Sequence, residues 1–117
     1  MVLNNLLNII KAATGIMPRP LNTSHLGTSI VYKFMSLLDD GVKKQDKFEV
    51  SIISMNLEEI ESLDLAIRKG ILKAGENKHN NYLKAEIIGG GLLQNSDNDF
   101  IEKLLIYNIT TRSELSE

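Results

Sequence analysis

The chain has 117 residues, 43% hydrophobic and 24% charged, with a formal net charge of -2; this fits one soluble domain large enough to bury its own core. Its lysines and arginines are scattered, and its apolar stretches fall far short of the roughly 20 residues that span a bilayer, so neither strong DNA binding nor a membrane segment is predicted. The absence of cysteine excludes disulfides and thiol chemistry.

Residues 2–13 are expected to form a short amphipathic helix, because leucine and isoleucine recur there at helical spacing. The residues of this stripe are Leu3, Leu6, Leu7 and Ile10. Gly15 is a stop signal, and Pro18 and Pro20 prevent the helix from resuming. We therefore expect a loop over residues 14–27, which is long for so small a domain.

A β-hairpin is predicted next. In residues 29–38 both alternating sets of side chains are largely apolar, which indicates a strand buried on much of both faces. Asp39-Asp40-Gly41 is a hairpin turn signal. The return strand over residues 46–54 has one apolar and one polar set, so one of its faces should be covered and the other solvated. The apolar set is Phe48, Val50 and Ile52.

A second, longer helix is expected to begin at Asn56, a good N-cap, with Glu59 in the position of a capping box. Its apolar stripe comprises Ile60, Leu63, Ile67, Ile71 and Ala74. Gly70 interrupts the pattern, which a close approach of this helix to the sheet would explain. Gly75 is expected to end the helix.

The remainder of the chain predicts two more strands. Residues 82–93 form one, and the triplet Gly89-Gly90-Gly91 indicates a bulge or bend within it. The triplet does not fit a phosphate-binding loop, because neither a Gly-Lys-Ser/Thr ending nor a helix follows it. A polar turn leads to the last strand, residues 100–111, and residues 112–117 are expected to be a disordered tail.

The predicted fold is therefore α+β: a single domain over residues 1–111 with the order α-β-β-α-β-β. A four-stranded antiparallel or mixed sheet would have one face covered by the long helix, and the short helix would cover part of the other. Strands 29–38 and 100–111 are apolar on both faces. We therefore expect a neighbouring subunit to cover the rest of the second face, or a strand edge to pair between chains.

No arrangement of residues predicts catalysis or a bound cofactor or metal. His25 and His79 lie in polar loops without the spacing of a metal site, and Ser24-His25 lacks the nucleophile-elbow pattern. The acidic residues of the predicted turns are Asp39, Asp40, Asp97 and Asp99. Acids in turns commonly have structural roles, so the sequence favours a structural protein over an enzyme.

Seven segments share a layout with a known family: the short helix, the proline-containing loop, the strands IVYKFMSL and KFEVSIIS, the helix NLEEIESLDLAIRKGI, and the strands KAEIIGGGLLQ and FIEKLLIYNITTR. Over about residues 2–111 this layout resembles the tail terminator, or tail completion, proteins of long-tailed phages and phage-derived tail machines. The glycine triplet is a departure from the family pattern.

The resemblance implies a homo-oligomeric ring, a hexamer, that caps the tail tube, stops its polymerisation and offers a docking surface to a head-completion or connector protein. It implies no catalytic residue and no cofactor. The ring would assemble in the host cytoplasm and then become part of the virion or tail-like particle. DNA would pass through the lumen only as cargo, where an acidic wall repels phosphate. The candidate lumen or ring-face residues are Asp39, Asp40, Asp97 and Asp99.

Two alternatives remain open. A head–tail connector or neck protein would also form a ring, but it would bind portal-side partners instead of tube protein. A small-molecule-binding regulatory domain with a ferredoxin-like sheet is the other alternative, although that fold usually follows the order β-α-β-β-α-β.

Overall fold

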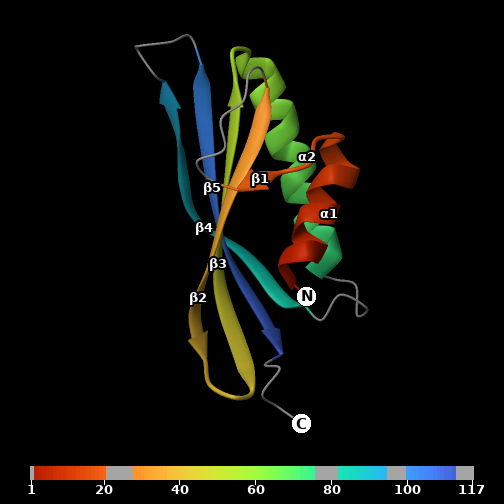
Figure 1. Ribbon diagram of the computed structural model, residues 1–117, viewed down its shortest axis with the longest axis vertical. Coiled ribbons are helices and arrows are strands. Elements are labelled where there is room, and N and C mark those ends of the chain that lie inside the picture. Colours follow the sequence, from red (N-terminus) through yellow and green to blue (C-terminus); the bar gives the residue numbers. More distant parts are fainter. Residues whose placement is uncertain (1, 21–27, 76–81, 95–99, 113–117) are drawn as a thin grey trace.

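The computed structural model describes residues 2–20, 28–75, 82–94 and 100–112 (Figure 1). The chain forms, in order, α1 (Val2–Thr14), β1 (Arg19–Pro20), β2 (Ser29–Asp39), β3 (Lys43–Ser54), α2 (Leu57–Gly75), β4 (Tyr82–Gln94) and β5 (Ile101–Arg112). Both helices and all four long strands were predicted, and β5 ends one residue later than expected, so Arg112 belongs to the strand and not to the tail. Residues 113–117 lie outside the described part of the chain.

The strands form one mixed sheet in the order β1-β2-β3-β5-β4. The pairs β2–β3 and β5–β4 are antiparallel, as the predicted hairpins require. β3 also pairs antiparallel with β5, which was not predicted. β3 and β4, which α2 connects, consequently run parallel on either side of β5. The sheet has five strands and not four, because β1 pairs parallel with Val31 and Tyr32 of β2. Pro20, one of the two prolines that predicted a loop, is tolerated in β1 because β1 is an edge strand.

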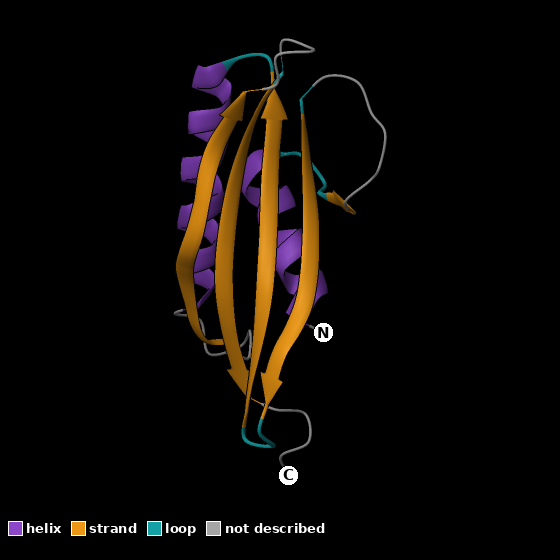
Figure 2. Ribbon diagram, turned by 90° about the vertical axis from the view of Figure 1, so that its left-hand side faces the viewer, coloured by secondary structure: helices purple, strands orange, loops and turns teal. Residues whose placement is uncertain are grey.

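Both helices lie on the same face of the sheet, α1 beside α2 (Figure 2). The expectation that the long helix alone covers this face, with α1 on the other, is therefore wrong. The buried apolar stripe of α1 joins that of α2 and the inward residues of three strands in one core. Its fully buried members include Leu6, Ile10, Ile30, Phe48, Val50, Ile52, Ile60, Ile67, Ile71, Leu105, Tyr107 and Ile109.

Gly70 allows the two helices to pack closely. A Cβ at this position would lie 3.1 Å from Cγ2 of Ile9 and 3.5 Å from Cβ of Ala13, both in α1. The close approach predicted for Gly70 is real, but its partner is α1 and not the sheet. Leu63, on the same flank of α2, packs against the core, whereas the side chain of Ala74 lies outside the described part.

The start of α2 is capped differently from a capping box. Oδ1 of Asn56 accepts hydrogen bonds from the N–H groups of Glu58 (2.9 Å) and Glu59 (3.3 Å), as predicted for an N-cap. The Asn56 N–H, however, donates to Oγ of Ser54 at 3.1 Å. The Glu59 carboxylate accepts hydrogen bonds from Ser54 and Thr28, and so ties the helix start to the sheet.

The predicted bulge in β4 is present, and it lies at the start of the glycine triplet. The register against β5 shifts between Ile87 and Gly89, and Gly90 has a φ of 143°, in a region that L side chains rarely adopt. A Cβ on Gly90 would lie 2.2 Å from the carbonyl oxygen of Leu104. The strand can bend at this point only because residue 90 has no side chain.

The two strands predicted to be apolar on both faces differ from that expectation. In β2 only the first three residues, Ser29, Ile30 and Val31, are buried, and the strand is exposed from Ser36 onward. In β5 the helix-facing residues from Leu105 onward are buried, whereas Leu104 and Ile106 on the other face are half-buried. Burial on both faces is thus limited to short stretches, near the start of β2 and near the end of β5, where Ile109 and Thr110 are both buried.

Candidate assembly surfaces

The face of the sheet turned away from the helices is open to the viewer in Figure 2. Side chains alternate along a strand, so this face carries the residues between the core positions. Leu104 and Ile106 of β5 and Ile53 of β3 supply half-buried apolar surface there. Lys47 and Glu49 form an ion pair of 3.2 Å on β3. The described part of this face is therefore mixed in character, with apolar residues beside paired charges.

The hairpin turn between β2 and β3 carries two of the acidic residues predicted for a ring face or lumen. Oδ1 of Asp39 accepts a hydrogen bond from the N–H of Gly41 at 3.0 Å. Oδ1 of Asp40 accepts hydrogen bonds from the N–H groups of Val42 (2.8 Å) and Lys43 (2.7 Å). These two hydrogen bonds lower the pKa of Asp40 below its ordinary value, and the bond from Lys43 has the larger effect. Both acids therefore stabilise the turn through hydrogen bonds to its backbone. Their position at a ring face or lumen remains a prediction.

The other two candidate acids, Asp97 and Asp99, lie outside the described residues, as do Ser24, His25 and His79. Among the residues that are described, no three histidine, aspartate or glutamate side chains come together in a way that would hold a metal ion. No helix in the described ranges is both long and apolar enough to cross a membrane.

An exposed apolar edge is the most prominent surface feature. β4 is the outermost strand of the sheet and pairs with β5 alone among the described strands. Four of its large apolar side chains are exposed, with 54% of Ile88 and 58% of Leu93 accessible; the other two are Ile87 and Leu92. Native proteins usually protect an edge strand with charge, proline or a covering loop.

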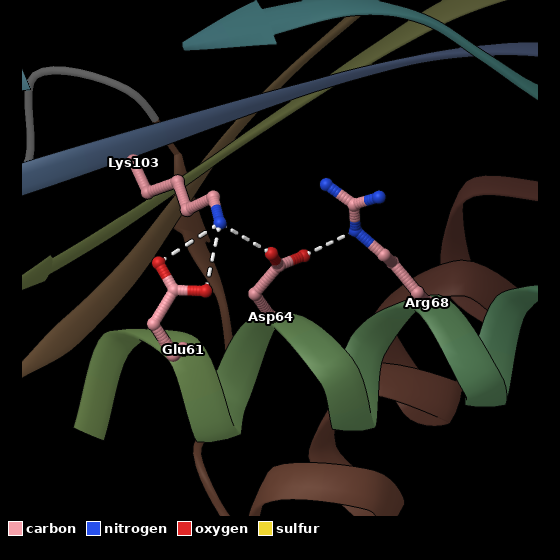
Figure 3. Close-up of polar contacts among 4 residues, drawn as sticks. All are labelled: Glu61, Asp64, Arg68 and Lys103. Carbon is pink, nitrogen blue, oxygen red and sulfur yellow. Dashed lines mark hydrogen bonds and ion pairs between the residues drawn. The ribbon is translucent and has the colours of Figure 1, made fainter. Parts of the chain in front are cut away.

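A cluster of charged side chains lies between α2 and β5 (Figure 3). Nζ of Lys103 lies 3.1 Å from both carboxylate oxygens of Glu61 and 2.7 Å from Oδ2 of Asp64. Nε of Arg68 donates to Oδ1 of Asp64 at 2.6 Å. The hydrogen bond to Asp64 is the main cause that raises the pKa of both Arg68 and Lys103, so both cations stay charged at neutral pH.

This cluster has a structural role, because its ion pairs connect α2 to β5. Both oxygens of the buried Asp64 are occupied by cations, which leaves this carboxylate no vacant oxygen for acid–base work. Tyr107, the nearby hydroxyl, is fully buried and its hydroxyl oxygen has no hydrogen-bond partner within the described chain. Burial raises the pKa of Tyr107 well above its ordinary value and keeps it protonated.

Sequence reasoning missed both the apolar edge and the charged cluster. The spacing of Asp64 and Arg68, four residues apart on a helix, is a signal for an ion pair. Lys103 is a charged residue in an alternating set of β5 whose other members are mostly apolar. Nothing in the sequence pairs Lys103 with a helix some 40 residues earlier. The exposure of β4 depends on strand order, which its pattern of side chains does not encode.

No protein-family model matches the sequence, and no curated protein matches it significantly. Solved structures do share its fold. One is a chain from the structure described as the virion of a native gene transfer agent (GTA) particle, which is 11% identical in sequence. The match covers 95% of this chain and 92% of the other, with a TM-score of 0.66. At this identity the similarity concerns the fold, and it includes nearly the whole length of both chains.

Proposed function

We propose that the chain is a structural, non-enzymatic subunit of a phage-like virion or tail-like particle. The observation that carries this proposal is the shared fold: the likeness spans nearly both whole chains, and the other chain belongs to a GTA virion particle. A small protein that leaves one sheet face without a helix and one long edge with exposed apolar residues is suited to assembly with other subunits.

Within such a particle, the subunit is proposed to form a ring, a hexamer, that caps the tail tube and stops its polymerisation. The opposite surface of the ring would dock to a head-completion or connector protein. The layout of helices and strands that resembles tail terminator proteins supports this role, and the open sheet face and edge supply surfaces for neighbouring subunits. Assembly would occur in the host cytoplasm, with DNA only as cargo in the lumen.

The turn acids would have a place in this arrangement. Asp39 and Asp40 sit at the end of the β2–β3 hairpin, which extends beyond the helices (Figure 1). An extended hairpin with two carboxylates would present negative charge at a ring face or to the lumen, where it would repel the DNA backbone. Asp97 and Asp99 are proposed for the same role on sequence grounds.

Negative-stain microscopy of the purified chain, alone and mixed with tail-tube subunits of the same particle, tests the proposal. Six-fold rings and tubes of uniform length with a ring at one end are the expected result. Tubes that keep growing in the presence of the chain, with no ring at either end, would rule out the capping role. Pull-down with portal-side proteins instead of tube subunits would favour the connector or neck alternative.

A further inference from the structure

The exposed apolar surface at the β4 edge continues onto α2. Leu65 and Leu72 are seven residues apart, so they lie on one side of the helix, and both are exposed. Glu61 and Arg68 share this side and reach toward β5 (Figure 3). Gly70, on the opposite flank, contacts α1. The two leucines therefore extend the apolar surface of β4 on the side of α2 that faces away from α1.

We call this surface the β4 ledge, and its members are Leu65, Leu72, Ile87, Ile88, Leu92 and Leu93. β4 is 13 residues long, or about 44 Å at ~3.4 Å per residue. A long edge strand offers backbone N–H and C=O groups to another strand, and apolar side chains on both of its faces add burial to that pairing. The chemistry of the ledge fits a β-strand with apolar side chains of its own.

The opposite edge of the same sheet supplies such a strand. β1 pairs with β2 only at Val31 and Tyr32. From Lys33 to Asp39, β2 pairs with β3 and with no other described strand. This open segment of β2 is about 24 Å long at ~3.4 Å per residue, so it fits within the length of β4. It also carries two exposed leucines, Leu37 and Leu38.

Strand direction makes the two edges compatible. The four long strands alternate in direction across the sheet, because each neighbouring pair is antiparallel. With an even number of alternating strands, β4 and β2 run in opposite directions. A second copy added in the same orientation beside β4 would therefore place its β2 antiparallel to β4. The alternation of strand direction would then continue from one copy to the next, with the helices of both copies on the same side of the sheet.

From these observations we infer that the β4 ledge of one copy binds the open segment of β2, Lys33–Asp39, of the next copy. This joint is heterologous: each copy uses one edge to bind and offers the other. Repetition of a heterologous joint closes into a ring when the rotation permits it, whereas β4-to-β4 pairing would stop at a dimer and leave both β2 edges open. The inference rests on the proposed ring, and it names the surfaces that build it.

Chemical cross-linking tests the joint directly, because the chain has no natural cysteine. We would prepare the full-length variants Ile88→Cys and Leu37→Cys, one of them with a mass tag, and treat them with a short bis-maleimide. The joint predicts a dimer that contains one copy of each variant, while neither variant alone gives a cross-linked dimer. A chain with both cysteines should give a ladder of covalent oligomers that ends at the closed ring. Met55→Cys, at an exposed position directly after the interior strand β3, is the control.

Other outcomes overturn the inference in distinguishable ways. Self-dimers of Ile88→Cys would show β4-to-β4 pairing in its place. Six-fold rings that cap tubes but give no mixed cross-link would overturn this joint and leave the proposed function intact. Mixed cross-links in assemblies that never cap a tube would support the joint and contradict the capping role. A chain that stays monomeric and gives no cross-link at high concentration would overturn the joint.

A charge variant provides a second readout. Ile88→Lys combined with Leu93→Lys places two cations on the ledge, where lysine commonly prevents strands from pairing. Both positions are exposed, so the fold of the monomer should remain. Light scattering should show a shift to monomer, with at least a tenfold rise in the concentration needed for assembly. Met55→Lys, at a position that is 62% exposed, should assemble as the natural chain does; an unchanged assembly of the double variant would contradict the joint.

Discussion

Oδ2 of Asp64 lies 2.7 Å from Nζ of Lys103, and this ion pair joins α2 to the interior strand β5. Asp64 is buried, and its other oxygen is held by Arg68. Together with the hydrogen bonds of Glu59 at the helix start, the pair supplies a polar connection between α2 and the sheet. It fixes how α2 lies on the sheet, and thereby the position of the flank that carries Leu65 and Leu72.

Asp64→Asn should lower the free energy of unfolding by roughly 2 kcal/mol, because Lys103 and Arg68 both lose the charge they share. This is less than the roughly 3–5 kcal/mol lost when a fully buried pair is broken, since Glu61 still pairs with Lys103 and Arg68 reaches solvent. Urea unfolding measures the change. Glu61→Gln removes a half-exposed partner and should cost below about 1 kcal/mol. Equal losses of unfolding free energy in the two variants would show that the burial of Asp64 does not increase the contribution of its ion pairs to stability.

Gly90→Ala should destabilise the chain by at least about 2 kcal/mol, because a residue with a side chain is strained at a φ of 143° and its Cβ would collide with the Leu104 carbonyl. Gly91→Ala is the matched control, since a Cβ there meets nothing within 4 Å; its effect should stay within about 1 kcal/mol. Thermal unfolding of both variants is the measurement. Similar melting temperatures would contradict the assigned bulge.

At the interface of the helices, Gly70→Ala should change stability by less than about 1 kcal/mol. The gain in helix propensity, about 1 kcal/mol, is offset by the few tenths of an ångström that the Ile9 side chain must move. Gly70→Leu should instead cost roughly 2–3 kcal/mol, because it forces α1 away from α2.

Lys69→Leu introduces the same side chain one residue earlier, at an exposed position, and serves as the control for Gly70→Leu. Unfolding by denaturant would reveal the difference between the two variants. A cost for Lys69→Leu as large as that for Gly70→Leu would attribute the effect to leucine on the helix surface and not to the contact with α1.

The long elements could be predicted to within one to three residues, because each has a period or punctuation of its own: the stripe of α1, the Asp40-Gly41 turn, the Asn56 cap. β1 could not, because a two-residue strand exists only through its pairing with Val31 and Tyr32. An amphipathic stripe shows that α1 buries one side, but it does not show which face of the sheet receives it. The glycine at position 70 correctly predicted a close approach of α2 to another element. The predicted neighbour, the sheet, was wrong, because the sequence does not show that α1 lies beside α2.

The assembly surfaces could be predicted only in part. Apolar residues on strands raised the expectation of self-association, but they pointed to residues 29–38 and 100–111. The longest exposed edge is β4, whose apolar residues resemble those of a buried strand. Ile88 and Leu93 are exposed because β4 is the last strand in the order β1-β2-β3-β5-β4. Strand order arises from contacts between distant segments, so a reading of one segment at a time does not supply it.

Asp46 predicts a specific pH dependence of stability. Its side chain is fully buried on the same sheet face as Phe48, where Ser36 donates to Oδ1 at 3.2 Å. Nζ of Lys44 lies 3.8 Å from Oδ1, and Oδ2 has no hydrogen-bond partner among the described residues. Burial is the main cause that raises the pKa of Asp46 above its ordinary value. The folded chain therefore binds this proton more tightly than the unfolded chain does.

For such an acid, stability increases as the pH falls through the raised folded pKa, and the gain is complete below the unfolded value of about 3.9. The natural chain should thus gain stability relative to Asp46→Asn between pH 7 and about pH 4, because asparagine carries no proton to bind. Urea unfolding of both chains across this range measures the difference. Asp40→Asn is the control: Asp40 is exposed and its pKa is lowered, so the natural chain should lose stability relative to this variant as the pH falls. A gap between the natural chain and Asp46→Asn that does not vary from pH 7 to pH 4 would mean that Asp46 is ionised as readily in the fold as in the unfolded chain, and that its buried carboxylate has a partner that offsets desolvation.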